Sequence, residues 1–277
     1  MTRFGLFVRL AVLAAAFLAL APLQYGALKL KATRLAGVLP ICLHRLFLRL
    51  FGLRVEVQGT APEGVGPILV LANHVSWLDI PVMSSLLPLS FVAKQEIAGW
   101  PIFGVCAKLQ RCIFLDRARK AATAIANAEM AARLRAGDVI VLFPEGTTGD
   151  GNRLLPFRSS LVGAARAALA GSEVGEIRLQ PLAISYTRRN GLPVTRRERP
   201  DIAWYGDMDL PPHFLAFARG GPLDVVVVWG EPIPFGPKSD RKQATLKAER
   251  IVKLSLARCG GRELAPQPYS LDEANSL

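Results

Sequence analysis

The sequence has few of the residues that bind metals or form disulfides. Its 277 residues include three histidines and four cysteines, Cys42, Cys106, Cys112 and Cys259. The cysteines form no C-x-x-C pair and have no zinc-like spacing to a histidine. We therefore interpret them as reduced core residues, which is typical of a reducing compartment, and predict no metal site.

Complete motifs for nucleotide binding and for serine hydrolases are also missing. The glycine-rich stretch "FPEGTTGDG" (143–151) matches the first half of a Walker A pattern, but Asn152 and Arg153 stand where Lys and Ser/Thr should be. No third glycine completes a dinucleotide-binding fingerprint, and no G-x-S-x-G sequence occurs. The sequence therefore argues against a nucleotide-binding enzyme and against an α/β-hydrolase.

Acidic residues are scarce relative to basic ones. The chain has 34 Lys and Arg against 22 Asp and Glu, a net charge of +12. Such a charge indicates an anionic partner: nucleic acid, an anionic membrane surface or an acidic carrier protein. The basic loop "YTRRNGLPVTRRERP" (186–200) is either a docking face of this kind or an ordinary solvated surface. Because no nucleic-acid motif accompanies the charge, we predict no nucleic-acid partner.

One long hydrophobic run is present, at the N-terminus. Residues 10–23 are uncharged and almost wholly apolar, and the run extends to Leu28 if its two polar residues lie at a membrane interface. About twenty apolar residues are needed to span a bilayer as a helix, so the run is borderline in length. Arg3 and Arg9 precede it, as in a signal peptide, but no clear small-x-small cleavage site follows.

The next segment, 35–53, is again apolar but contains basic residues. This pattern is typical of an amphipathic helix in the membrane interface. Basic residues after the first apolar run favour a cytoplasmic main domain by the positive-inside rule; they are Lys29, Lys31, Arg34, Arg45 and Arg49. We expect residues 1–52 to form a membrane-associated helical hairpin rather than core helices. We expect this hairpin to lie at the inner (cytoplasmic) membrane, with the active site facing the cytoplasm.

After residue 52 the sequence alternates between strand-like and helix-like patterns. We expect strands at 53–59, 67–72, 89–94, 111–116, 138–143, 177–186 and 223–230, and helices at 120–137, 159–170 and 240–257. A further helix is expected to begin at Ser76, with Asp79 at the capping-box spacing. This alternation predicts an α/β fold, with a single mixed sheet flanked by helices over residues 53–262 and a flexible tail over 263–277.

The candidate chemistry lies at two strand ends, where ligands gather in α/β sheets. "ANHVSWLD" follows the strand at 67–72, and "FPEGTTGDG" follows the strand at 138–143. In the first, Asp79 is placed to orient the imidazole of His74 and leave its second nitrogen free as a base. The alternatives are a capping Asp79 beside a solvated His74, or Ser76 as an acyl-enzyme nucleophile; without a nucleophile elbow, Ser76 fits an N-cap better.

Four blocks together resemble the glycerolipid acyltransferase family. "NHVSWLD" has the family's H-x4-D form, and "FPEGTT" resembles its F-P-E-G-T block. Between them, "FVAKQEIAGWPIFG" and "IFLDR" are similar to the second block, and "LQPLAISY" is similar to the fourth. The blocks occur in the family's order and spacing over residues 65–190.

The resemblance implies an O-acyltransferase without metal or other cofactor. His74 would be the general base that deprotonates the hydroxyl of a lysolipid, and Asp79 would orient it. The hydroxyl oxygen would attack the thioester of acyl-CoA or acyl-acyl carrier protein directly. The implied substrate residues are Glu145, Gly146, Thr147, Lys94, Phe114 and Arg117 for the acceptor and Pro181 for the acyl donor. Phe114 and Pro181 are alternatively core or turn residues, and Lys94 and Arg117 solvated ones.

The sequence departs from the family after "EGT". Members that act on lysophosphatidate usually have arginine there, which can pair with phosphate, whereas this chain has Thr148. The stretches 143–157 and 199–210 are more similar to the bacterial branch that acylates lyso-ornithine lipid. Arg153 or Arg158 could replace the missing charge, so lysophosphatidate stays an alternative acceptor. A membrane-anchored binding protein without catalysis is a more distant alternative, which the complete four-block pattern disfavours.

Overall fold

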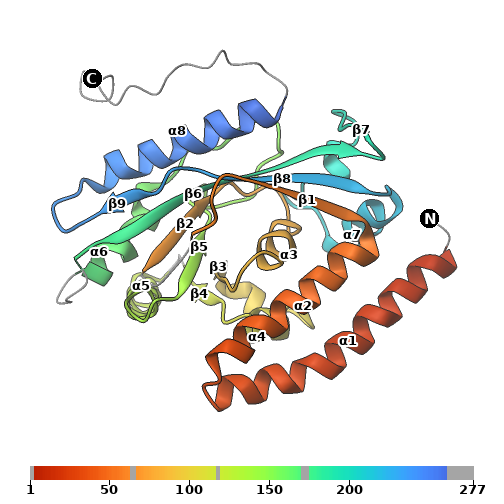
Figure 1. The fold of residues 1–277 in the computed structure, drawn as a ribbon, viewed down its shortest axis with the longest axis horizontal. Helices are drawn as coiled ribbons and strands as arrows, with labels where there is room; N and C mark the ends of the chain where they lie inside the picture. The colour runs from red at the N-terminus through yellow and green to blue at the C-terminus, as the bar shows by residue number, and fades with distance from the viewer. Residues whose placement is uncertain (1–2, 63–66, 117–118, 170–174, 261–277) are drawn as a thin grey trace.

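The described part of the chain forms one mixed sheet with helices on both faces (Figure 1). The computed structural model describes residues 3–62, 67–116, 119–169 and 175–260. Arg117 and the predicted tail lie outside these residues. The predicted fold class is confirmed.

The sheet has the strand order β1-β8-β6-β2-β5-β3-β4, and β7 and β9 also pair with β6. The strands are β1 (Leu53–Gln58), β2 (Ile68–Ala72), β3 (Ser90–Lys94), β4 (Ile113–Leu115), β5 (Val139–Leu142), β6 (Ile177–Arg189), β7 (Leu192–Pro193), β8 (Leu223–Trp229) and β9 (Ile233–Phe235). Strands β6, β2, β5, β3 and β4 are parallel to one another, and β8 and β1 run against them.

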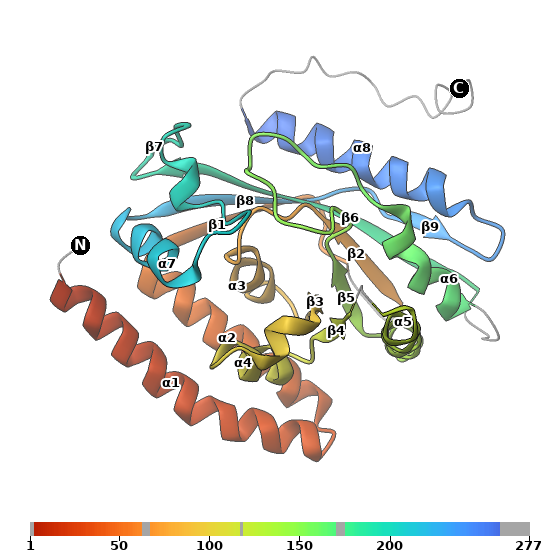
Figure 2. The same ribbon diagram turned by 180° about the vertical axis from the view of Figure 1, so that it is seen from behind.

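Helices cover both faces of this sheet. The α-helices are α1 (Arg3–Lys29), α2 (Thr33–Phe51), α3 (Asp79–Ser84), α4 (Phe103–Leu109), α5 (Lys120–Arg135), α6 (Gly163–Leu169), α7 (Leu210–Arg219) and α8 (Arg241–Cys259). Short 3₁₀ helices are η1 (Gln95–Gly99), η2 (Ser159–Val162) and η3 (Arg199–Asp201). Figures 1 and 2 show α8 on one face of the sheet and α1, α2 and α3 on the other.

Strand β2 lies at the centre of the protein and is buried along its whole length. Leu69 and Leu71 face the core shared with α5 and α8, whereas Ile68 and Val70 face the core shared with α2 and α3. All four side chains have 0% exposure. A continuous apolar run is what a strand covered on both faces requires, and it makes β2 a rigid base for the loop that follows.

The helix expected at Ser76 begins three residues later, at Asp79. The carboxylate of Asp79 accepts the backbone N–H groups of Val75 and Ser76, so the residues after β2 form a loop and a turn before the helix starts. Helix α7 and strands β7 and β9 are additions to the predicted elements.

The N-terminal hairpin consists of α1 and α2, which lie side by side in both views (Figures 1 and 2). Helix α2 is joined to the core by Phe47, Leu48 and Phe51, which are buried. Helix α1 is outermost, and it is long and apolar enough to cross a membrane, with only 6% of its apolar window buried. Such exposure distinguishes α1 from a core helix and leaves a large apolar surface in need of cover.

We expect the full chain to remain membrane-bound through residues 1–52. High salt removes proteins held by charge alone, whereas apolar burial of α1 in lipid resists it. Fractionated membranes should keep the intact protein in the pellet after both high salt and alkaline carbonate, and detergent should release it. Release of the intact protein by salt alone would contradict this prediction.

Candidate active site

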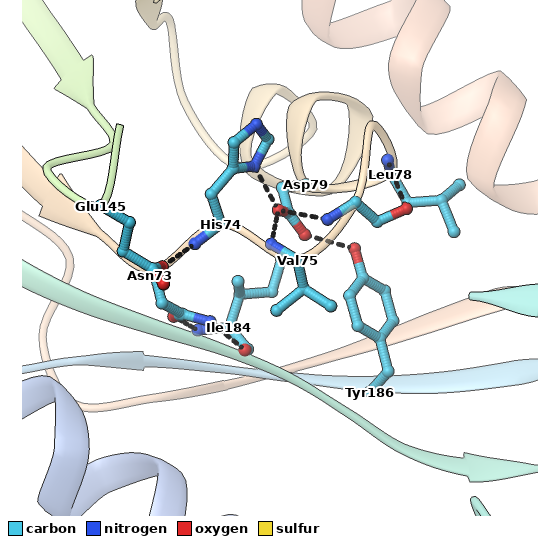
Figure 3. Close-up of polar contacts among 9 residues, drawn as sticks. Asn73, His74, Val75, Leu78, Asp79, Glu145, Ile184 and Tyr186 are labelled. Carbon is cyan, nitrogen blue, oxygen red and sulfur yellow. Dashed lines mark hydrogen bonds and ion pairs between the residues drawn. The ribbon is translucent and has the colours of Figure 1, made fainter. Parts of the chain in front are cut away.

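A side chain continues the central sheet beyond the end of β2. Asn73 is buried, and its Nδ2 donates to the carbonyl of Ile184 in β6 at 3.0 Å, while the N–H of Ile184 donates to its Oδ1 at 2.8 Å. The amide therefore makes the pair of bonds that another strand residue would make. It fixes the point at which the backbone leaves the sheet and turns toward His74 (Figure 3).

The imidazole of His74 and the carboxylate of Asp79 meet, as the sequence predicts. His74 Nδ1 lies 2.8 Å from Asp79 Oδ2, and the Asp79 side chain has 0% exposure whereas that of His74 has 19%. Because a carboxylate only accepts, Nδ1 carries the proton and Nε2 has a free lone pair. Nε2 has no hydrogen-bond partner among the described residues.

Asp79 is held by three further donors. Its Oδ2 also accepts the backbone N–H groups of Val75 at 2.8 Å and Ser76 at 3.0 Å, and its Oδ1 accepts the hydroxyl of Tyr186 at 2.6 Å. Burial, and then the charge of Asp79, raise the pKa of Tyr186 well above its usual value, so the hydroxyl keeps its proton and donates. Ser76 is wholly buried, and its Oγ accepts the N–H of Leu78.

Tyr186 was not among the predicted site residues. It comes from the last part of the strand predicted at 177–186, and only the pairing of β6 with β2 brings that part beyond the end of β2. A strand pattern in the sequence does not predict which residues of two strands lie opposite each other when the strands are more than a hundred residues apart. A tyrosine at the end of a predicted strand does not by itself indicate a site residue.

The loop after β5 holds the His74 loop from the other side. Glu145 is 3% exposed. Its Oε1 accepts the backbone N–H of His74 at 2.6 Å, and its Oε2 accepts that of Leu155 at 2.9 Å. The N–H of Gly149 donates to the carbonyl of His74 at 2.8 Å. Burial raises the pKa of Glu145 to about 7, against the lowering effect of its two N–H donors. In this structure Glu145 positions the backbone of His74.

The ring of His74 is positioned by stacking on Phe143. The two ring centroids lie 3.9 Å apart with an angle of 11° between the planes. Phe143 is itself buried at the end of β5. The imidazole is therefore fixed by Asp79 at one edge and by an aromatic face on one side, and it needs little reorganisation to accept a proton at Nε2.

A third segment, 199–204, is hydrogen-bonded to both the loop after β2 and the loop after β5. The N–H of Trp204 donates to the carbonyl of Val75 at 2.9 Å, and the guanidinium of Arg199 donates to the carbonyl of Gly151. Gly151 has φ +72°, and a Cβ there would lie 3.2 Å from Val75 Cγ1. A glycine is therefore needed where the three segments converge.

The other predicted residues are more widely spread. Thr147 is exposed and Thr148 is half-buried, both beside Gly146, whose φ is +79°. Lys94 ends β3 and is exposed, whereas Phe114 of β4 lines a surface hollow of about 360 Å³ with Lys108, Arg111 and other residues. Pro181 is buried within β6, where its carbonyl accepts the N–H of Gly230 at 3.0 Å.

Two further observations concern cofactors and charge. Among the described residues, no three His, Cys, Asp or Glu side chains gather closely enough to hold a metal ion. Arg153 and Arg158, the possible replacements for an arginine after "EGT", are both exposed.

Comparisons with known proteins identify the family of this chain. The model of the Acyltransferase family matches residues 54–185, a range that contains His74, Asp79 and Glu145. The lyso-ornithine lipid O-acyltransferase of Brucella abortus is 45% identical over 251 residues, which cover 91% of this chain and 93% of that protein. The protein of the same name from Rhizobium meliloti is also 45% identical, over 81% of this chain and 77% of that protein.

More distant relatives have a different name. The 1-acyl-sn-glycerol-3-phosphate acyltransferase of Neisseria gonorrhoeae is 37% identical over 157 residues, 57% of this chain and 56% of that protein. The crystal structure of the 1-acyl-sn-glycerophosphate acyltransferase of Thermotoga maritima has a TM-score of 0.56 at 20% identity, over 91% of this chain and 96% of that one, and shows the same fold. The chain thus belongs to the acyltransferase family and is an acyltransferase, as its four sequence blocks indicate.

Proposed function

We propose that this enzyme transfers a fatty acyl group from acyl-CoA or acyl-acyl carrier protein to the free hydroxyl of a lysolipid at the cytoplasmic face of the inner membrane. The observation that carries the proposal is the buried Asp79 carboxylate bound to Nδ1 of His74, with Nε2 free. A neutral imidazole oriented in this way is a general base near neutral pH.

The reaction follows from that geometry. Nε2 of His74 takes the proton of the acceptor hydroxyl while the hydroxyl oxygen bonds to the thioester carbonyl carbon. The carbon–sulfur bond then breaks, the imidazolium returns the proton to the leaving thiolate, and the products are the ester and a free thiol. Asp79 stabilises the imidazolium between these two steps, and no covalent enzyme intermediate is needed.

For the acceptor we propose lyso-ornithine lipid. Two relatives of that name align with most of this chain, and Thr148 offers a neutral hydroxyl where a phosphate-binding arginine is usual. The alternative acceptor is 1-acyl-sn-glycerol-3-phosphate, which the names of the Neisseria and Thermotoga proteins favour. The implied acceptor contacts of Lys94, Phe114, Gly146 and Thr147 belong to this proposal, and so does the contact of Pro181 with the donor.

Replacing the base should abolish turnover without unfolding the protein. General-base catalysis contributes about 10² to 10⁴-fold, so His74→Ala should lose at least about 10²-fold in kcat with an unchanged circular dichroism spectrum. Ser76→Ala is the matched control, because the buried Ser76 hydroxyl bonds a backbone N–H and should be dispensable. A loss of only about tenfold or less in His74→Ala would rule out the dyad. An inactive Ser76→Ala variant would favour the acyl-enzyme alternative.

Removing the Tyr186 hydroxyl should alter both rate and pH dependence. Tyr186→Phe leaves Asp79 Oδ1 without a donor, and a hydrogen bond to a charged group contributes about 1.5 to 3 kcal/mol. We expect kcat to fall about 10-fold or more. The acid limb of the pH–rate profile should move to higher pH, because an unscreened carboxylate holds the imidazolium more strongly. Tyr25→Phe, at an exposed residue of α1, is the control. If the acid limb of the pH–rate profile does not move, Tyr186 contributes only packing at this site.

Thr148→Arg should shift the preference between the two acceptors. A phosphate monoester carries roughly −1.5 to −2 charge, which an arginine can pair, whereas the ammonium of an ornithine head group is repelled by it. Activity on lyso-ornithine lipid should fall, and activity on lysophosphatidate should rise relative to it. The measurement is kcat/KM of both proteins on both acceptors. Agreement of the two preference ratios within about threefold would show that Thr148 does not read the head group.

A further inference from the structure

A second exposed apolar surface lies outside the N-terminal hairpin. It consists of four residues around the start of α4, here called the α4 ridge: Trp100, Ile102, Phe103 and Val105. Their side chains are 37%, 67%, 47% and 49% exposed. Four large apolar side chains exposed within six residues are unusual for a protein surface surrounded by water alone.

The backbone of the α4 ridge is strained at Ile102. Ile102 has φ +63° and ψ −58°, and the N–H of Phe103 donates to the carbonyl of Pro101 at 2.6 Å. This is the γ-turn of positive φ, which is rare, and a β-branched residue in it is rarer still. Gly104 packs so tightly that a Cβ would lie 2.5 Å from the carbonyl oxygen of Ala98. Strain of this kind persists where it has a function.

One end of the α4 ridge is connected to the membrane hairpin. Nε2 of Gln24 in α1 donates to the carbonyl of Leu109, the last residue of α4, at 2.9 Å and to that of Ala36 in α2 at 3.0 Å. Figures 1 and 2 both place α4 beside α1 and α2. Apolar surface is also exposed at Leu23, the neighbour of Gln24 in α1, and at Leu30, just after the end of α1.

The other end of the α4 ridge reaches the active site. The rings of Trp100 and Trp204 meet edge to face, with centroids 6.4 Å apart, and the N–H of Trp204 is bonded to Val75, the residue after His74. The ridge therefore runs from the membrane hairpin to the segment that covers the catalytic loops.

The chemistry of the α4 ridge suits a lipid surface. Tryptophan is enriched at membrane interfaces, where its ring lies at head-group level. Lys94 and Lys108 are exposed just before and just after the ridge, where they can attract anionic head groups. We propose that the α4 ridge is a second membrane contact, which enters the interfacial layer of the bilayer and holds the segment that contains Trp204 against the lipid.

The α4 ridge has a functional meaning if the proposed acyl transfer at a membrane is correct, since it would let the acceptor reach His74 without leaving the bilayer. The contact itself can be tested without any activity. The test uses the full chain on vesicles of phosphatidylcholine and phosphatidylglycerol, with and without phosphatidylcholine brominated on its acyl chains, which quenches nearby tryptophan fluorescence.

Bromolipid should quench part of the wild-type emission, and Trp100→Phe should lose most of that quenched component. Trp229→Phe is the control, because Trp229 in β8 is only 4% exposed, whereas Trp77 and Trp204 are half-buried. Equal quenching of the wild type and Trp100→Phe would overturn the proposal, as would no quenching in vesicles that the protein binds.

A second measurement tests the function of the α4 ridge. The double variant Ile102→Asp/Phe103→Asp should raise KM for lysolipid in vesicles by about tenfold, with kcat and pelleting with vesicles unchanged because α1 still binds. A water-soluble short-chain lysolipid should be used equally well by both proteins. Leu246→Asp, at a 61% exposed residue of α8 on the other face of the sheet (Figure 1), should change nothing.

An unchanged KM in the double variant would overturn the functional role of the ridge. A change in oligomeric state by light scattering, together with unquenched Trp100, would assign the ridge to contact with a second copy instead and also overturn the proposal. A wild-type protein inactive on every lysolipid would refute the proposed function, and the quenching result would still stand.

Discussion

The buried carboxylate of Asp79 is the constraint on which the active site depends. A charge removed from water is tolerated only when donors surround it, and Asp79 with 0% side-chain exposure accepts four hydrogen bonds. Two donors are backbone N–H groups of the loop after β2, one is the His74 ring and one is the hydroxyl of Tyr186. Satisfying this carboxylate thus shapes the loop before α3 and selects the tautomer of His74.

The long strand β6 makes these contacts possible. It pairs with β2 as far as Leu182 opposite Ala72 and then continues past the end of β2. Its extension gives Ile184 to Asn73 and Tyr186 to Asp79. Because β6 is also hydrogen-bonded to β8 along most of this length, the wall that holds Asp79 cannot shift without disturbing the sheet. The rigidity that the proposed general-base mechanism needs would therefore come from sheet pairing.

Sequence patterns were sufficient for the features that are local. The apolar run of β2 predicted a buried strand, and the spacing between His74 and Asp79 predicted a contact that is now measured at 2.8 Å. What the sequence could not provide was register between distant segments. Tyr186 lies 107 residues after Asp79, and the bond from Trp204 to Val75 joins parts of the chain that are still farther apart. The capping-box spacing correctly predicts that Asp79 accepts the backbone N–H of Ser76. It does not reveal that the same carboxylate also binds His74, Val75 and Tyr186, or that α3 begins only at Asp79.

The position of Glu145 changes how the glycine-rich loop is understood. Its sequence block implies a substrate contact, but both of its carboxylate oxygens are bonded to backbone N–H groups, one of them that of His74. We expect residues that contact the acceptor from this loop to come from the part that follows, where Thr147 is exposed and Thr148 is half-buried. In the proposed mechanism the loop would have two roles: the buried Glu145 carboxylate holds the backbone of His74, and the residues after it can vary with the head group. Such a division would allow one catalytic frame to serve acceptors as different as a phosphate and an amino acid, because the change in specificity would leave the dyad untouched.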